Sequence, residues 1–177
     1  MQEILDFWFT ELPPKQHFVK DAALDETIRA RFGNTLEAAA KCELFAWRQT
    51  AAGRLAEIIV LDQFSRNVYR DTPRSFAQDA LALVLAQELV ASAQDSSLPA
   101  AQRVFAYMPY MHSESALVHT QAVVLFTQLG IQDNLNFEMR HKTIIDRFGR
   151  YPHRNAILGR SSSAEELAFL AEPGSSF

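Results

Sequence analysis

The sequence contains few of the residues that end helices or cross-link chains. Its 177 residues include 6 glycines, 7 prolines and one cysteine, Cys42. An all-β chain needs a tight turn every ten residues or so, and this glycine and proline content is low for that purpose. One cysteine excludes an intrachain disulfide, and we expect Cys42 to be a small buried residue packed between helices.

Long hydrophobic runs are also absent. The longest uninterrupted apolar stretch is the seven residues 80–86, whereas a membrane-spanning helix needs about 20. The first basic residue is Lys15, and the N-terminus lacks both the positive region and the small-residue cleavage site of a secretory signal. We therefore expect a cytoplasmic protein that does not associate with membranes.

The charges nearly balance, but they are unevenly placed. The chain has 17 Lys plus Arg and 21 Asp plus Glu, a net charge of -4, which argues against a dedicated nucleic-acid-binding protein. Residues 140–160 contain six basic residues and one acid, so this segment is +5 and the remainder is -9. Arginine dominates the segment, and its planar guanidinium group suits bidentate contacts with carboxylates or phosphates.

Nearly every segment repeats its apolar residues at the helical spacings i, i+3 and i+4. We predict helices, in chain order, over residues 4–12, 25–32, 36–44, 53–69, 76–92, 100–108, 113–130 and 134–148, with a last helix after 163. No stretch alternates apolar and polar residues over the length of a strand. The sequence therefore predicts one all-α domain over residues 1–177, built of stacked antiparallel helix pairs, with a frayed tail at about 173–177.

The ends of these helices are predicted from residues that interrupt or cap a helix. We expect Gly33 to end the second helix and Pro109 to stop the sixth. Ser113 and Asn134 are expected to cap the seventh and eighth helices. Ser163 is expected to begin a capping box at the last helix.

Two charged residues fall on an apolar face of the helix predicted over residues 53–69. At 100° per residue, Asp62 and Arg66 share one stripe with Leu55, Ile58 and Ile59. Charges on a core-facing stripe must be paired and hydrogen-bonded, because an unpaired buried charge is costly. Two interpretations remain open: an ion pair that fixes helix packing, or a pair that lines a pocket.

Histidine follows the same pattern in the eighth predicted helix. His141 shares the stripe of Phe137 and Ile144 and therefore faces inward. A lone histidine on an apolar face is usually a hydrogen-bonded core residue. A functional role also stays open, because His112 lies beside Glu114 at the start of the seventh helix.

The basic segment ends in an irregular loop between two glycines, which contains Arg150, His153, Arg154 and Asn155. One interpretation is that its arginines fasten the loop to acids elsewhere in the chain. The other is that arginines held in an irregular loop form an anion-binding site.

Motifs for metals, nucleophiles and cofactors are missing. His112, Glu114, His141 and His153 include metal-ligand types, but none has a local spacing such as H-E-x-x-H, and the nearby arginines disfavour a dication. The chain also has no G-x-S-x-G, P-loop or glycine-rich dinucleotide motif. We expect neither a metal nor a cofactor.

Four polar motifs together resemble a known bacterial family. They lie at residues 61–67, 107–114, 148–155 and 158–160, and their order and spacing match across nearly the whole chain. The family is domain-of-unknown-function family 924, DUF924. The resemblance implies an all-α fold similar to tetratricopeptide-like superhelices, and it implies no reaction.

The first functional hypothesis is a binding module for a small anionic ligand or a peptide carboxylate, held between helix pairs. Arginines would hold the anion, and the acids would orient the arginines. The candidate ligand-binding residues are Asp62, Arg66, Asn67, His112, Glu114, His141, Arg150, His153, Arg154 and Asn155.

The second hypothesis is a hydrolase or lyase that acts on a polar small substrate. His153 or His141 would be the general base, and Glu114 or Asp62 would orient it. Arg150 or Arg154 would stabilise an oxyanion. The histidine must then lie within hydrogen-bond reach of a carboxylate and face a cavity.

The third hypothesis is a structural polar network in a protein that acts through an interaction surface. An exposed apolar patch around Trp8, Phe9 and Phe18 would then contact a partner protein or a second copy of the chain.

Overall fold

The computed structural model describes residues 1–176, which form helices and loops without any strand. Its α-helices are α1 Gln2–Asp6, α2 Ala22–Ala40, α3 Ala51–Ile59, α4 Ser65–Val68, α5 Asp79–Ala91, α6 Ala100–Met111, α7 Ala116–Leu129, α8 Gln132–Phe148 and α9 Ala164–Leu170. The π-helical turn Phe7–Glu11 follows α1, and another, Val60–Phe64, joins α3 to α4. Short 3-10 turns lie at Pro14–Phe18, Phe45–Gln49, Pro73–Phe76, Gln94–Ser97 and Pro152–Arg154. The all-α prediction is confirmed.

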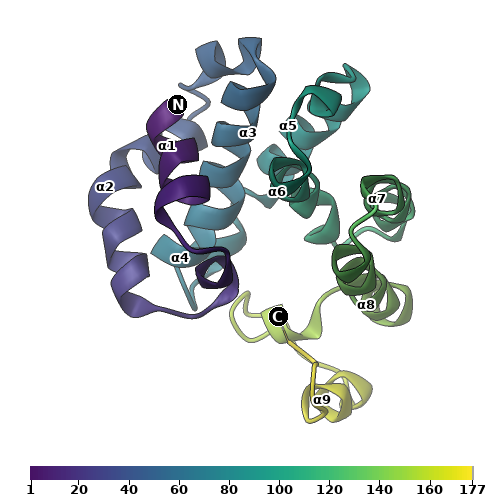
Figure 1. The fold of residues 1–177 in the computed structure, drawn as a ribbon. Helices are drawn as coiled ribbons and strands as arrows, with labels where there is room; N and C mark the ends of the chain where they lie inside the picture. Colours follow the sequence, from purple (N-terminus) through teal and green to yellow (C-terminus); the bar gives the residue numbers. More distant parts are fainter. Residues whose placement is uncertain (177) are drawn as a thin grey trace.

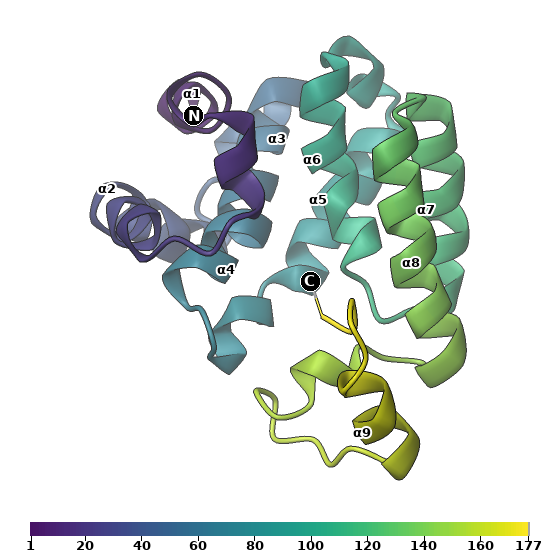
Figure 2. The same cartoon turned by 60° about the horizontal axis from the view of Figure 1, so that its bottom comes forward.

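Consecutive helices stack side by side in the second half of the chain. Helix α6 contacts α5 and α7, and α7 contacts α8 (Figure 1). Figures 1 and 2 show the loop after α8 and the short helix α9 below the ends of α4 and α8. A tetratricopeptide-like superhelix stays a prediction. Within residues 1–176, no helix is long and apolar enough to span a membrane.

The apolar residues form a main core and a smaller C-terminal cluster. The main core runs through α1 to α7 and contains fully buried aromatic residues such as Trp8, Phe64 and Phe126. The smaller cluster joins the end of α8 to the following loop through Ile145 and Tyr151. This second cluster fixes the loop that carries the arginines.

Gly33 does not end a helix, contrary to the prediction, because α2 continues through it. A Cβ placed at Gly33 would meet nothing within 4 Å, so the glycine is not required by close packing. Ile28, Phe32 and Leu36 of the same helix are buried. A mid-helix glycine costs about 1 kcal/mol, less than the roughly 1.5–3 kcal/mol that each buried large apolar side chain contributes.

Pro109 lies inside α6 instead of stopping it, so that prediction was also wrong. The proline removes one backbone N–H near the end of the helix, and α6 continues for two residues to Met111. All residues from Val104 to Met111 are buried. Packing on every side of this last turn keeps it helical.

The predicted helix starts were partly correct. Ser163 forms the expected capping box, in which its Oγ accepts from the Glu166 N–H at 3.1 Å. Ser113 does not cap α7, since its Oγ instead accepts from the N–H of Ser115, the residue before the helix. Helix α8 begins at Gln132, two residues before Asn134.

Cys42 is exposed rather than buried as predicted. It has a φ of 60° in the turn that closes α2, and its N–H donates to the Ala39 carbonyl at 2.9 Å. The side chain therefore leaves the helix surface instead of packing between helices.

The expected apolar patch is smaller than predicted, because Trp8 is fully buried. Its ring stacks on His17, with centroids 4.6 Å apart, and meets Phe105 edge-on. Phe18 is exposed and stacks on Phe105. In the predicted frayed tail, Ser175 is buried and donates to the Leu170 carbonyl, while residue 177 lies outside the described residues.

Candidate functional site

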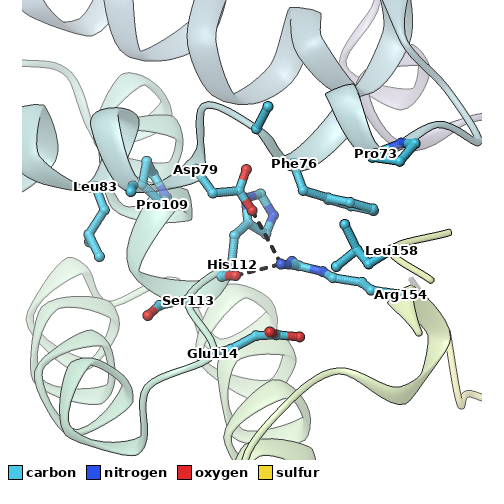
Figure 3. Close-up of a pocket in the computed structure, with 12 residues that line it drawn as sticks. Pro73, Phe76, Asp79, Leu83, Pro109, His112, Ser113, Glu114, Arg154 and Leu158 are labelled. Atoms are coloured by element: carbon cyan, nitrogen blue, oxygen red, sulfur yellow. Dashed lines mark hydrogen bonds and ion pairs between the residues drawn. The ribbon is translucent and has the colours of Figure 1, made fainter. Parts of the chain in front are cut away.

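A cleft of about 380 Å³ lies between the start of α5, the end of α6 and the loop after α8 (Figure 3). Its apolar lining consists of Pro73, Phe76, Ala77, Ala80, Leu83, Pro109 and Leu158. Its polar lining consists of Asp79, His112, Ser113, Glu114 and Arg154. The cleft thus combines apolar walls with acidic, basic and imidazole side chains.

Behind one wall of the cleft lies Asp62, which the π-helical turn between α3 and α4 carries into the core. Such turns often occur at functional sites. One Asp62 oxygen is 2.7 Å from His112 Nδ1 and 3.1 Å from Arg66 Nη1, and the other accepts from Gln63. Burial opposes ionisation, but the Arg66 charge and these hydrogen bonds hold the pKa of Asp62 well below its ordinary value. Asp62 is therefore a carboxylate.

His112 follows the last residue of α6 and connects Asp62 to the cleft. A carboxylate only accepts hydrogen bonds, so Nδ1 of His112 carries the hydrogen and Nε2 of the neutral ring is an acceptor. No residue in the described part of the chain hydrogen-bonds to Nε2. Burial and the Arg66 charge lower the pKa of His112, against the opposing effect of Asp62. The imidazole is therefore neutral at pH 7.

Asp79, the first residue of α5, is shared by two arginines. Arg66 donates to both of its carboxylate oxygens, at 3.0 and 3.1 Å. Arg154 reaches the same carboxylate from the C-terminal loop at 3.2 Å and also donates to the His112 carbonyl at 3.0 Å (Figure 3). The helix N-terminus favours a carboxylate at this position.

Arg154 is the least compensated charge at the cleft. Only 6% of the residue is exposed, and its guanidinium carbon lies 4.6 Å from the ring centroids of both Phe76 and Tyr151. Its Nε is buried and makes no hydrogen bond with residues 1–176. Burial and the charge of Arg66 lower the pKa of Arg154. This cation would gain from a further anion.

Glu114 anchors the C-terminal loop beside the cleft. It accepts two hydrogen bonds from Arg160, at 2.6 and 2.9 Å, and one from the Tyr151 N–H at 2.8 Å. Burial opposes its ionisation, but these contacts hold the pKa of Glu114 below its ordinary value. Arg160 also donates to Asn155, which is fully buried and donates to Ser162. The loop that presents Arg154 is therefore held by a connected network.

Arg147 at the end of α8 and Arg150 in the following loop bind the C-terminal helix. Arg150 makes a two-point contact with Glu166, at 2.6 and 2.8 Å, and Arg147 pairs with Glu165 at 2.8 Å. Neither arginine lines the cleft. For these two, the interpretation as fasteners of the loop agrees with the contacts, whereas Arg154 faces the cleft.

The sequence-predicted residues divide by position. His112, Glu114 and Arg154 line the cleft, and Asp62 and Arg66 bond directly to that lining. The residues outside the lining are Asn67, His141, Arg150, His153 and Asn155.

Two of these outside residues, Asn67 and His141, are buried and hydrogen-bonded, and His153 is half-buried. Asn67 donates to Asp25 at 2.8 Å. His141 contacts the Phe137 carbonyl through Nδ1 at 2.8 Å, and burial lowers its pKa to about 3. Burial, with the charge of Arg154, lowers the pKa of His153 to about 4.

Sequence reasoning missed Asp79 and a buried His119–Glu138 pair. Asp79 sits in the first turn of a helix, where an acid ordinarily signals only a helix start. His119 shares a helical face with Ala122 and Phe126, so the projection that identified His141 would have found it. In the described part of the chain, no group of three or more His, Cys, Asp or Glu residues is placed to hold a metal ion.

Comparisons with known proteins identify relatives without an assigned activity. A family model described as "Bacterial protein of unknown function (DUF924)" matches residues 4–174. A solved structure of a protein of unknown function from Agrobacterium tumefaciens is similar, with a TM-score of 0.91 and 38% sequence identity over 96% of each chain. The search of curated proteins found no match.

Proposed function

Because the chain belongs to the DUF924 family, whose function is unknown, we propose from the site itself that the protein binds a small molecule with an apolar body and a carboxylate group. The cleft at α5, α6 and the C-terminal loop is the binding site. Arg154 is the observation that carries the proposal, since this buried cation shares its carboxylate partner Asp79 with Arg66.

The charges around Arg154 favour an anionic ligand. Arg66 is already paired with both Asp62 and Asp79, so Asp79 only partly compensates Arg154. A guanidinium group binds a carboxylate through two parallel hydrogen bonds, stronger than neutral ones. A ligand carboxylate would therefore compensate the charge that burial makes costly.

The other walls of the cleft favour an apolar ligand body. Phe76, Leu83 and Leu158 present apolar side chains beside the charged groups. Ligand sites commonly have this composition, with mostly apolar lining and a few convergent polar groups that fix orientation. A bare inorganic anion would leave these apolar walls in contact with water.

Isothermal titration calorimetry with hexanoate, octanoate and phenylacetate tests the proposal, with hexan-1-ol as the uncharged control. We expect the carboxylates to bind and hexan-1-ol to bind at least tenfold more weakly. Arg154→Gln should abolish carboxylate binding, because it removes the under-compensated cation. Arg147→Gln removes an exposed cation outside the cleft and should bind as the wild type does.

A second variant separates loss of binding from loss of folding. Ala80 is exposed on α5 and lines the cleft, so Ala80→Trp should block binding while leaving the charged network in place. Equal binding of hexanoate and hexan-1-ol, or unchanged binding by both cleft variants, would contradict the proposal. Absence of carboxylate binding together with a large loss of melting temperature in Arg154→Gln would assign the network a structural role.

A further inference from the structure

The carboxylate site leaves one reactive group of the cleft without a role. His112 is held by Asp62 through Nδ1, at 2.7 Å, while its Nε2 accepts no hydrogen bond from residues 1–176. Asp62 is itself fixed by Arg66 and Gln63 inside the core. A neutral imidazole oriented by a buried carboxylate, at the wall of a cleft, is the arrangement that a general base requires.

We propose that His112 is a general base and that the protein hydrolyses small esters of apolar carboxylic acids. This inference rests on the proposed function, because the carboxylate bound at Arg154 is then the product of the reaction. Asp62 is a positioning residue that holds the proton on Nδ1 and stabilises the imidazolium ion. Water is the only co-reactant.

The reaction balances without any further reagent. A water molecule transfers one proton to Nε2 of His112 as its oxygen forms a bond to the ester carbonyl carbon. The tetrahedral intermediate then collapses, the bond from carbon to the alcohol oxygen breaks, and the imidazolium ion returns the proton to that oxygen. The products are an alcohol and a carboxylic acid, which ionises by releasing its proton to solvent.

Arg154 lies next to His112 and suits the negative charge that develops in this reaction. Its Nη2 donates to the His112 backbone carbonyl at 3.0 Å, and both residues line the cleft (Figure 3). A charged donor near the carbonyl oxygen stabilises the oxyanion of the intermediate, a contribution that is large in sites shielded from water. The same guanidinium then meets the product carboxylate.

Other histidines lack this combination of features. His119 has both ring nitrogens occupied, Nδ1 by Glu138 at 2.7 Å and Nε2 by the Ser113 carbonyl at 2.8 Å. His141 is buried and His153 is half-buried, and both lie outside the cleft lining. His17 packs against Trp8 in the N-terminal part of the chain, away from the cleft lining.

The test measures hydrolysis of 4-nitrophenyl butanoate, hexanoate and octanoate together with calorimetric binding of hexanoate. His112→Gln keeps a hydrogen-bond donor towards Asp62 but has no basic nitrogen. We expect kcat to fall on the order of 100-fold or more, the usual contribution of a general base, while hexanoate still binds. His17→Gln controls for unspecific catalysis by imidazole and should retain wild-type kcat.

Asp62→Asn tests the positioning role of Asp62 through the pH profile of kcat/KM. A purely structural role of Asp62 would not change the midpoint of this profile. Wild-type kcat/KM should rise with pH as His112 loses its proton and then level off. Removing the carboxylate destabilises the imidazolium ion, so the midpoint of this pH profile should move to lower pH and kcat should fall. An unchanged midpoint would overturn the positioning role of Asp62.

The outcomes separate the two proposals. If the wild type binds hexanoate but hydrolyses the esters no faster than His112→Gln does, the catalytic proposal is overturned and the binding proposal stands. If the wild type neither binds hexanoate nor hydrolyses any of the esters, both are overturned. Loss of hydrolysis in His112→Gln with unchanged hexanoate binding supports both.

Discussion

Arg154 differs from the neighbouring arginines in its counter-ion. Arg147, Arg150 and Arg160 each pair with a glutamate of their own, whereas Arg154 shares Asp79 with Arg66. Burial without a dedicated counter-ion is costly for a cation. In the proposed function, Arg154 is therefore the arginine that contacts the ligand, while Arg147, Arg150 and Arg160 hold the loop.

The buried residue His141 leads to a prediction about how the stability of the protein depends on pH. The pKa of His141 is about 3 in the folded protein, below the value of about 6.5 in an unfolded chain. As the pH falls from 7 to 5, the unfolded chain therefore binds the proton first, and acid shifts the equilibrium towards unfolding. Urea denaturation should show a lower free energy of unfolding at pH 5 than at pH 7.

His141→Gln should reduce this pH dependence. Glutamine can donate to the Phe137 carbonyl as His141 Nδ1 does, but it does not titrate. The decrease in unfolding free energy between pH 7 and pH 5 should be smaller by up to about 1.4 kcal/mol per pH unit. A variant with the same decrease as the wild type would show that His141 binds its proton normally in the folded state.

Single helices were predictable where the apolar period is regular, and their ends were predictable where a local cap marks them, as Ser163, Gly130 and Gly149 do. The stripe that contains Asp62 and Arg66 follows from the period alone. The continuation of α2 through Gly33 and of α6 through Pro109 depends on burial against other helices. A rule based on neighbouring residues, such as a glycine or proline ending a helix, does not include the free energy of this burial. The residues that pack against α2 and α6 are far away in the sequence.

Substitution of Gly33 measures how much a glycine inside α2 costs in free energy of unfolding. Its Cβ position is open, and the residue lies in the interior of α2 without a positive φ. Gly33→Ala should therefore raise the free energy of unfolding by about 0.5–1 kcal/mol, through better helix propensity and a less flexible unfolded chain. A decrease, measured by urea denaturation at pH 7, would show that α2 is interrupted at this position.

In the whole molecule, the site depends on contacts that join distant parts of the chain. Asp62 meets His112 across 50 residues, and Arg154 meets Asp79 across 75. The sequence identified the members on apolar stripes and in the basic loop, because their local patterns are unusual. Asp79 was not identifiable, since an acid in the first turn of a helix has no unusual pattern and its partners are visible only in the fold.

A crystal structure of the protein soaked or co-crystallised with octanoate tests the central claim most directly. We predict that the octanoate carboxylate lies within hydrogen-bond distance of the Arg154 guanidinium group and that the alkyl chain contacts Phe76 and Leu83. Octanoate bound elsewhere, or an unoccupied cleft at saturating octanoate with Arg154 still paired only to Asp79 and the His112 carbonyl, would contradict the claim.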